Sequence, residues 1–193
     1  MKKYIIVFVV LFASILSLNA QGKADQVFTN VQVVNGKVVF QQFILTDNGL
    51  SEDQKYALLY KWGKDNYTGN PLLSGIRFNE QDKSITVSSK VELLLPPNSK
   101  GVREKMLMNY RFDASITRAG CMLLVRDITY QNVQGKDSSF FPKAFSAEEM
   151  ITDTAIASAQ GGDKELKVNT QKGTLTFLNE LFSSLNSVFE VKK

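Results

Sequence analysis

Apolar and polar side chains alternate along two long stretches in the middle of the chain. In residues 83–95 every second position is apolar or small, and the positions between are mostly polar. Residues 106–117 repeat this pattern, with Arg111 and Asp113 among the polar positions. Alternation with a period of two predicts β-strands that bury one face and leave the other in water. Antiparallel sheets allow this one-sided burial, whereas parallel sheets normally carry helices on both faces.

Shorter stretches predict the rest of the sheet. Further strands are expected at residues 38–45, 73–78 and 121–130. The facing of the last of these is ambiguous, and a bulge within it would shift the pattern. The dipeptide Asn35-Gly36 favours a type I′ turn, because both central residues of that turn need a positive φ. The chain is therefore expected to open with a hairpin, or with one strand that follows an arm.

Two amphipathic helices are predicted to cover the apolar face. Ser51 and Gln54 have the spacing of a capping box, which opens a helix that ends near Asp65. Residues 174–191 carry one broad apolar stripe at helical spacing. With the strands between them, these helices predict a single α+β domain in the order β-α-β-β-β-β-α. A curved antiparallel sheet of about five strands would carry both helices on one face and be polar on the other.

The interval 132–171 has no strong periodicity and is predicted as a long loop. A structureless loop of this length is uncommon in a compact domain. Ser146 and Glu149 have the spacing of a second capping box, which predicts a short helix within the interval.

The start of the chain has the three parts of a secretory signal. Two lysines precede an apolar run over residues 4–18, and the small residue Ala20 stands before Gln21. This pattern predicts a signal peptide of residues 1–20 and an exported protein, either periplasmic or extracellular. An uncleaved membrane anchor is the alternative. The apolar run is shorter than the roughly 20 residues that a spanning helix needs, so no transmembrane span is expected after cleavage.

The remaining chain divides into an N-terminal arm or extra strand over residues 21–34 and one domain over residues 35–193. Cys121 is the only cysteine, so the chain lacks the cysteine at the cleavage site that a lipoprotein needs. It also cannot form a disulfide within itself. Because its neighbours are apolar, Cys121 is expected to be a buried small hydrophobe rather than a reactive thiol.

Charge and composition exclude several classes of function. The chain has 23 basic and 19 acidic residues, and two of the basic ones lie in the signal, so the exported part carries 21 − 19 = +2. That charge is too small to argue for nucleic acid or an anionic membrane as a partner. The absence of histidine removes Ser-His-Asp catalysis and histidine-bound zinc. We therefore expect no catalytic residue, no cofactor and no metal.

The order of elements resembles a bacterial family, the domain of unknown function 4468, which has a TBP-like fold (like the TATA-box-binding protein). The resemblance covers roughly residues 35–191. Four segments carry it: Gly36-Lys37-Val38, residues 55–62, Tyr110-Arg111-Phe112 and residues 147–153. The basic residues that the family often has before its last helix are only weakly matched at residues 170–173. The family has no assigned activity, so the resemblance implies a fold and transfers no site.

Two sets of residues are candidates for contacting a partner or ligand. Phe140, Phe141 and Phe145 lie close together outside the predicted elements. They are expected either to plug the end of the core or to form a contact patch for a protein or an apolar ligand. Arg111 and Arg126 fall on the polar face of the sheet, where they form either cross-strand ion pairs or a site for a polar ligand or partner.

The sequence therefore predicts an uncharacterised exported protein that acts as a non-enzymatic binding or interaction module of the bacterial cell envelope. One alternative is a carboxylate-dependent hydrolase. That alternative needs two carboxylates to converge in a cleft, and its candidates are Asp113, Asp127, Glu148, Glu149 and Asp153. A second alternative, nucleic-acid binding, rests on analogy of fold alone.

Overall fold

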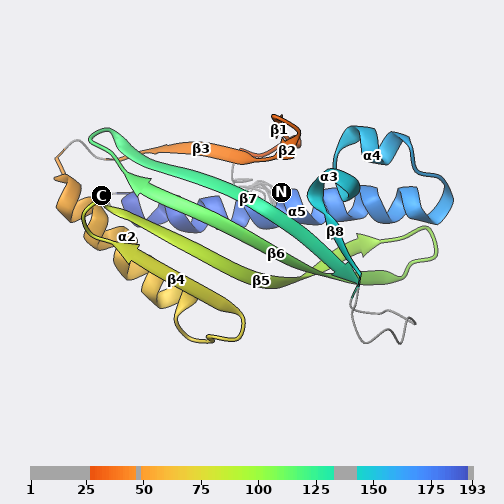
Figure 1. Ribbon diagram of the computed structural model, residues 1–193, viewed down its shortest axis with the longest axis horizontal. Helices are drawn as coiled ribbons and strands as arrows, with labels where there is room; N and C mark the ends of the chain where they lie inside the picture. The colour runs from red at the N-terminus through yellow and green to blue at the C-terminus, as the bar shows by residue number, and fades with distance from the viewer. Residues whose placement is uncertain (1–26, 47–48, 133–142, 191–193) are drawn as a thin grey trace, which may run out of the picture.

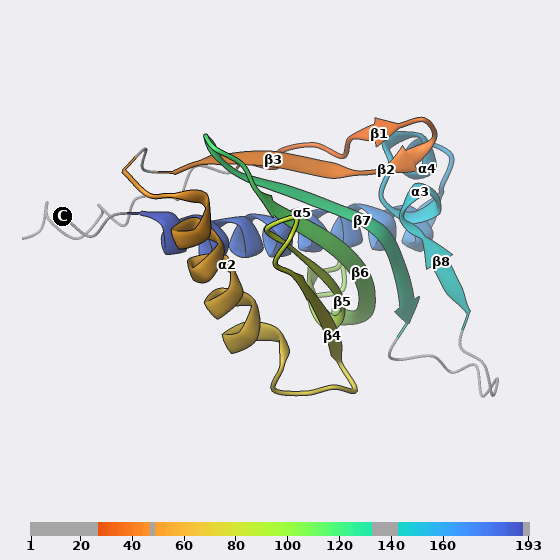
Figure 2. The ribbon, with the colours of Figure 1, turned by 60° about the vertical axis from the view of Figure 1, so that its left-hand side comes forward.

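The structure is a computed structural model that describes residues 27–46, 49–132 and 143–190. Its centre is a six-stranded antiparallel sheet that curves around the long helix α5 (Gly161–Phe189), and α2 (Glu52–Tyr67) packs on the same side (Figures 1 and 2). This arrangement confirms the predicted α+β class with two helices on one face. The sheet has more strands than the five or so expected.

The strands follow the order β3-β7-β6-β5-β4, and β8 pairs with β7 beside β3. Their bounds are β3 (Phe40–Leu45), β4 (Ser74–Asn79), β5 (Ser84–Pro97), β6 (Arg103–Ile116), β7 (Gly120–Asn132) and β8 (Ala144–Ser146). Every pairing is antiparallel. The alternation read from the sequence appears as one-sided burial, since Val87 and Phe112 are fully buried while Thr86 and Asp113 remain partly exposed on the other face.

The chain opens with a small hairpin of β1 (Val33–Val34) and β2 (Lys37–Val38). Asn35 and Gly36 have φ values of 52° and 76°, as a type I′ turn requires. The described chain therefore has a hairpin here, with an arm before it. The preceding arm packs on α5, because the Asn179 side chain accepts hydrogen bonds from the backbone amides of Val27 and Phe28, both at 2.9 Å.

Helix α2 begins with the predicted capping box at Ser51, and both of its hydrogen bonds are present. It ends at Tyr67, slightly beyond the expected Asp65. Helix α5 differs more, because it starts at Gly161 instead of residue 174. Asn169 and Thr170 are buried in its first half, so polar side chains occupy the inward stripe there. A search for apolar residues at helical spacing therefore misses the first half of this helix.

The predicted loop over residues 132–171 is therefore wrong for its described part. From Lys143 onward this interval contains β8, α3 (Ala147–Met150), α4 (Asp153–Ala157) and the first turns of α5. The short helix expected after Ser146 is α3, and its capping box is formed. Elements of three to five residues are too short to produce a measurable period.

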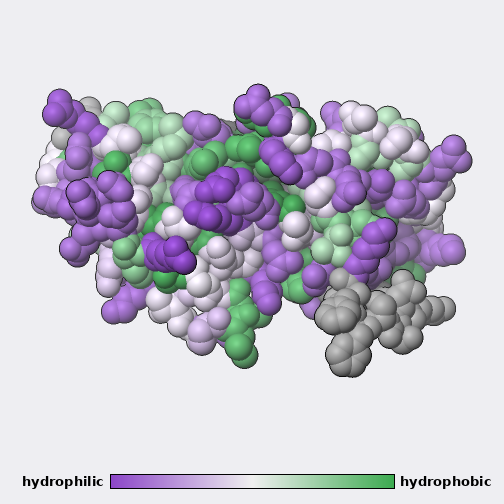
Figure 3. Space-filling view, in the orientation of Figure 1, coloured by the Kyte–Doolittle hydropathy of each residue, from purple (hydrophilic) through white to green (hydrophobic). Residues whose placement is uncertain are grey.

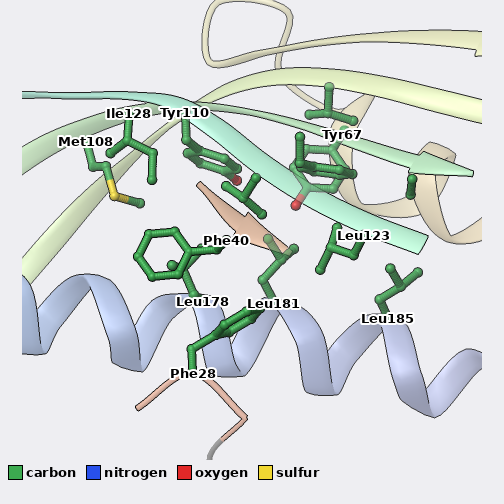
Figure 4. Packing of buried hydrophobic residues seen from close by; sticks show 14 of the residues in the cluster. Phe28, Phe40, Tyr67, Met108, Tyr110, Leu123, Ile128, Leu178, Leu181 and Leu185 are labelled. Atoms are coloured by element: carbon green, nitrogen blue, oxygen red, sulfur yellow. The ribbon is translucent and has the colours of Figure 1, made fainter. Parts of the chain in front are cut away.

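The core lies between the sheet and α5. Figure 4 shows Leu178, Leu181 and Leu185 of α5 pointing toward the sheet, with Phe28 and Phe40 packed beside them. The Phe28 and Phe40 rings meet edge to face with centroids 5.6 Å apart. None of the helices in the described part of the chain has the length and apolar character that crossing a membrane requires.

Candidate binding surface on the outer sheet face

The sheet face opposite α2 and α5 is called here the outer face. Because strand side chains alternate, it carries the polar positions of β5, β6 and β7. Figure 3 shows this face from the front, with hydrophilic residues over most of its middle and smaller hydrophobic areas between them. Arg111 and Arg126, which the sequence singled out, both lie here. The strand register places them directly opposite each other on β6 and β7.

Two carboxylates offset the repulsion between these arginines. Arg126 donates from Nε and Nη2 to Asp113 Oδ2, at 3.1 and 2.9 Å, and from Nη1 to Asp127 Oδ2 at 2.8 Å. Thr86 donates to the other oxygen of Asp113 at 2.6 Å. The arginines are thus part of a connected charge cluster, as one of the two sequence interpretations proposed.

The pKa of Asp113 reports the balance in this cluster. Partial burial works to raise the pKa, but the hydrogen bonds from Thr86 and Arg126 and the positive charges of Arg126 and Arg111 outweigh it. The pKa is therefore held below its ordinary value, and Asp113 is ionised at neutral pH.

A bulge in β7 sets the position of Asp127. The pairing of β6 with β7 shifts between Asn109 and Arg111, and Asp127 has a φ of 55°. The extra residue turns Asp127 outward while Ile128 next to it is buried. A positive φ is uncommon for a non-glycine residue, although aspartate adopts it more readily than most, and bulges are frequent beside functional sites. The bulge also explains the ambiguous facing of this strand in the sequence.

Arg111 opens onto a hollow that we call the arginine groove. It has a volume of about 440 Å³ and lies between the outer face and the loop that joins α2 to β4. Its lining residues are Pro71, Leu72, Leu73, Ser74, Gly75, Ser88, Ser89, Lys90, Asn109, Tyr110, Arg111 and Asp127. The groove therefore combines two cationic side chains with hydroxyl and amide groups and one carboxylate.

Arg111 has donors to spare in this groove. Its Nη2 lies 3.6 Å from Asp113 Oδ1, and its Nε is buried without a hydrogen-bond partner among the described residues. Arg126, in contrast, uses three nitrogens on two carboxylates. A guanidinium with open donors beside a lysine suits a planar or tetrahedral anion such as a carboxylate or phosphate.

A second hollow of about 700 Å³, the hairpin groove, lies on the other side of Asp127. Its lining residues are Val34, Asn35, Lys37, Val38, Val39, Gln41, Leu124, Arg126, Asp127, Ile128, Thr129, Ser146 and Glu148. Glu148 accepts a hydrogen bond from the backbone amide of Val38 at 2.8 Å. Partial burial works to raise the pKa of Glu148, but this bond and its other partners lower it. Glu148 therefore holds the hairpin in place.

The candidate carboxylates of the hydrolase alternative have structural partners. Glu149 closes the capping box of α3, and Asp153 accepts a hydrogen bond from Gln171 at 3.2 Å. The pKa values of Asp113, Glu148 and Glu149 are all lowered. An acid–base pair needs two pKa values that are pushed apart, and these three move in the same direction. The described residues also contain no cluster of three or more side chains that could hold a metal ion.

The aromatic candidates divide between two regions. Phe140 and Phe141 lie outside the described residues. Phe145 is on β8, where it pairs with Tyr130 of β7 and packs against the core. The Lys143 ammonium lies 4.8 Å from the centre of its ring. Phe145 is thus part of the packing at this end of the sheet.

Comparison with known proteins shows which solved structures share this fold. No sequence-family profile matches the chain, and no curated protein matches it. Two solved bacterial structures do. A TBP-like protein from Parabacteroides distasonis ATCC 8503 has a TM-score of 0.70 and 23% identity, over 84% of this chain and 99% of that one. A DUF4468 family protein from Bacteroides ovatus ATCC 8483 has a TM-score of 0.66 and 21% identity, over 83% and 91%. The chain therefore has the TBP-like fold of these two proteins, as its resemblance to the DUF4468 family predicted.

Proposed function

We propose that this protein is an exported, non-enzymatic binding module of the bacterial cell envelope, and that the arginine groove contacts its ligand or partner. The observation that carries the proposal is the state of Arg111. Its side chain is 41% exposed and lines the groove, and its ion pair with Asp113 is a long one of 3.6 Å from Nη2 to Oδ1. The exposed end of the guanidinium therefore has open donors, which an incoming anionic group would satisfy.

The groove favours a ligand with a carboxylate or phosphate group. Lys90 and Arg111 lie on neighbouring strands, and Lys90 is paired in register with Asn109. Asn109 and Ser88 add neutral polar groups beside them. A bidentate contact from Arg111 would fix the orientation of the anion, and Lys90 would add charge. Asp127 at the rim would repel a ligand with several negative charges, so one anionic group fits best.

Export is the second part of the proposal. The signal of residues 1–20 lies outside the described residues, so its support is the sequence pattern. Cleavage between Ala20 and Gln21 would spare the arm that begins at Val27 and packs on α5 through Asn179. We expect the protein from the envelope fraction of its host to begin at Gln21 when its intact mass is measured. A mass that includes residue 1 would contradict cleavage.

Site-specific crosslinking in the host tests the groove. A photoreactive amino acid at Ser88, which is exposed inside the arginine groove, should give a crosslinked product with the bound partner or ligand. The same amino acid at Ala57, exposed on α2, is the matched control and should give none. Adding Arg111→Gln to the Ser88 variant should reduce the product. Equal crosslinking from both positions, or none from Ser88, would count against the proposal.

A further inference from the structure

Half of β5 has an open edge. Strand β4 pairs with β5 only as far as Ser89, and the amide of Lys90 then donates to Leu73 O at 2.9 Å. Beyond Lys90, no strand in the described ranges covers this edge. In an antiparallel sheet, alternate residues direct both backbone groups to the same side. Glu92 and Leu94 share the parity of Lys90, so their backbone groups point out of the sheet.

Such an edge is a template for another strand. The open stretch ends where the pairing of β5 with β6 shifts between Leu94 and Pro97, and the prolines there cannot donate to a ladder. Below the edge lies a third hollow of about 330 Å³, the edge groove, between β5 and α5. Val91, Leu93 and Phe177 contribute its apolar surface. An added strand would place alternate side chains into this groove.

Exposed hydrophobic side chains lie along the same edge. Leu94 on β5 is 54% exposed, and Val102 in the hairpin after β5 is 51% exposed. At the other end, Leu72 and Leu73 are 82% and 47% exposed. Four of the eight large exposed hydrophobic residues in the described chain therefore lie on the open half of β5 or beside its two ends.

The edge groove also carries opposite charges at its two ends. Arg103 lines it at the β5–β6 hairpin. Glu180 lines it one helical turn beyond Phe177, whose ring contacts Tyr110 at 5.1 Å near the start of the open edge. Neither Arg103 nor Glu180 has an ion pair within the described residues.

We propose that two copies of this chain join edge to edge through β5, antiparallel, about a two-fold axis near Leu93. The backbone groups of Glu92 in each copy would then exchange hydrogen bonds with those of Leu94 in the other. The two-fold reverses the edge, so Arg103 of each copy meets Glu180 of the other, and the two hydrophobic ends meet each other. The interface is self-complementary, as a two-fold dimer requires.

The dimer extends the function proposed above. A two-fold that joins antiparallel edges keeps the outer faces of both copies on the same side of one continuous sheet. The two arginine grooves would then face the same way, so the dimer could engage a ligand with two anionic groups at once.

A charge swap tests the register of the interface. We expect the purified protein to show twice its monomer mass by light scattering at high concentration. Arg103→Glu and Glu180→Arg each place like charges together at both contacts, so each variant alone should shift the population toward monomer. The double variant should restore the dimer. The matched control is Glu80→Arg, an equal charge reversal in the turn at the far end of β5, which should leave the mass unchanged.

A backbone variant tests the edge itself. Leu94→Pro removes an N–H that points out of the sheet, so β5 keeps its bonds to β6 and the circular dichroism spectrum should be retained. The variant should be monomeric. A wild-type protein that stays monomeric at every concentration, a dimer that survives Leu94→Pro, or a double variant that stays monomeric would each overturn the proposal.

Discussion

Lys55 shows how a single polar side chain joins distant parts of this fold. It lies on α2 with only 1% of its surface exposed, and its ammonium donates to Arg118 O at 2.7 Å. A buried charge needs such a partner. This bond could not be predicted from the sequence, because a lysine in the first turn of an amphipathic helix is normally solvated. The sequence placed Arg111 on the polar face, but its meeting with Lys90 in one groove depends on strand register.

Cys121 gives a direct prediction at this scale. It is fully buried, as the sequence suggested, and burial raises the pKa of its thiol to about 12. The thiolate is the reactive form, so it is nearly absent at pH 8. We expect no reaction with a disulfide reagent at pH 8 in the native protein and one equivalent after unfolding in denaturant. Rapid reaction of the native protein would contradict the packing around Cys121.

Asp113 makes stability depend on pH. Its pKa is lowered in the folded state, so the ionised carboxylate stabilises the fold. This stabilisation is fully present above the unfolded-state pKa and is lost as the pH falls through the folded-state pKa. Asp113→Asn should cost about 1–3 kcal/mol of unfolding free energy at pH 7, because it breaks hydrogen bonds to a charged group. In strong acid the difference from wild type should shrink. Urea titrations of the wild type and the variant at pH 7 and in strong acid measure this difference in unfolding free energy. A difference that stays constant between the two conditions would show that Asp113 is not stabilised as the anion.

At the scale of elements, the sequence could predict those strands and helices that are long and that bury only one face. The strands β5 and β6 and the capped helix α2 follow from alternation and from the residues at their ends. The first half of α5 could not be predicted, because Asn169, Thr170 and Thr174 are buried there. Their partners explain why this is tolerated, since Thr174 donates to Thr170 O at 2.8 Å and is within 2.8 Å of the Tyr130 hydroxyl.

A substitution at Gly120 tests the close pairing of β3 with β7. A Cβ at this position would lie 2.0 Å from Ile44 O, a backbone atom that cannot move aside cheaply. Gly120→Ala should therefore destabilise the protein by about 2–3 kcal/mol or more by overpacking. Gly75→Ala on β4 is the matched control, because a Cβ there meets nothing within 4 Å. Thermal unfolding should separate the two variants clearly, and equal melting temperatures would contradict the close approach of β3 and β7.

At the scale of the molecule, the fold class was predictable and the candidate site was only partly so. Strands with one apolar face need a covering layer, and the helices α2 and α5, which lie before and after the series β4 to β7 in the chain, supply it. The polar face was therefore expected, with Arg111 and Arg126 on it. The arginine groove was not, because its wall comes from the loop between α2 and β4, and its rim depends on the bulge at Asp127. Neither feature has a period that a sequence pattern can reveal.

Native mass spectrometry of the protein purified from the envelope of its own host tests the central claim most directly. We predict a bound mass on the wild-type protein that is absent from Arg111→Gln. It should persist on Arg77→Gln, which removes an exposed arginine of β4 that lines none of the three grooves described above. A wild-type protein with no bound mass, or the same bound mass on Arg111→Gln, would contradict the assignment of the arginine groove as the binding site.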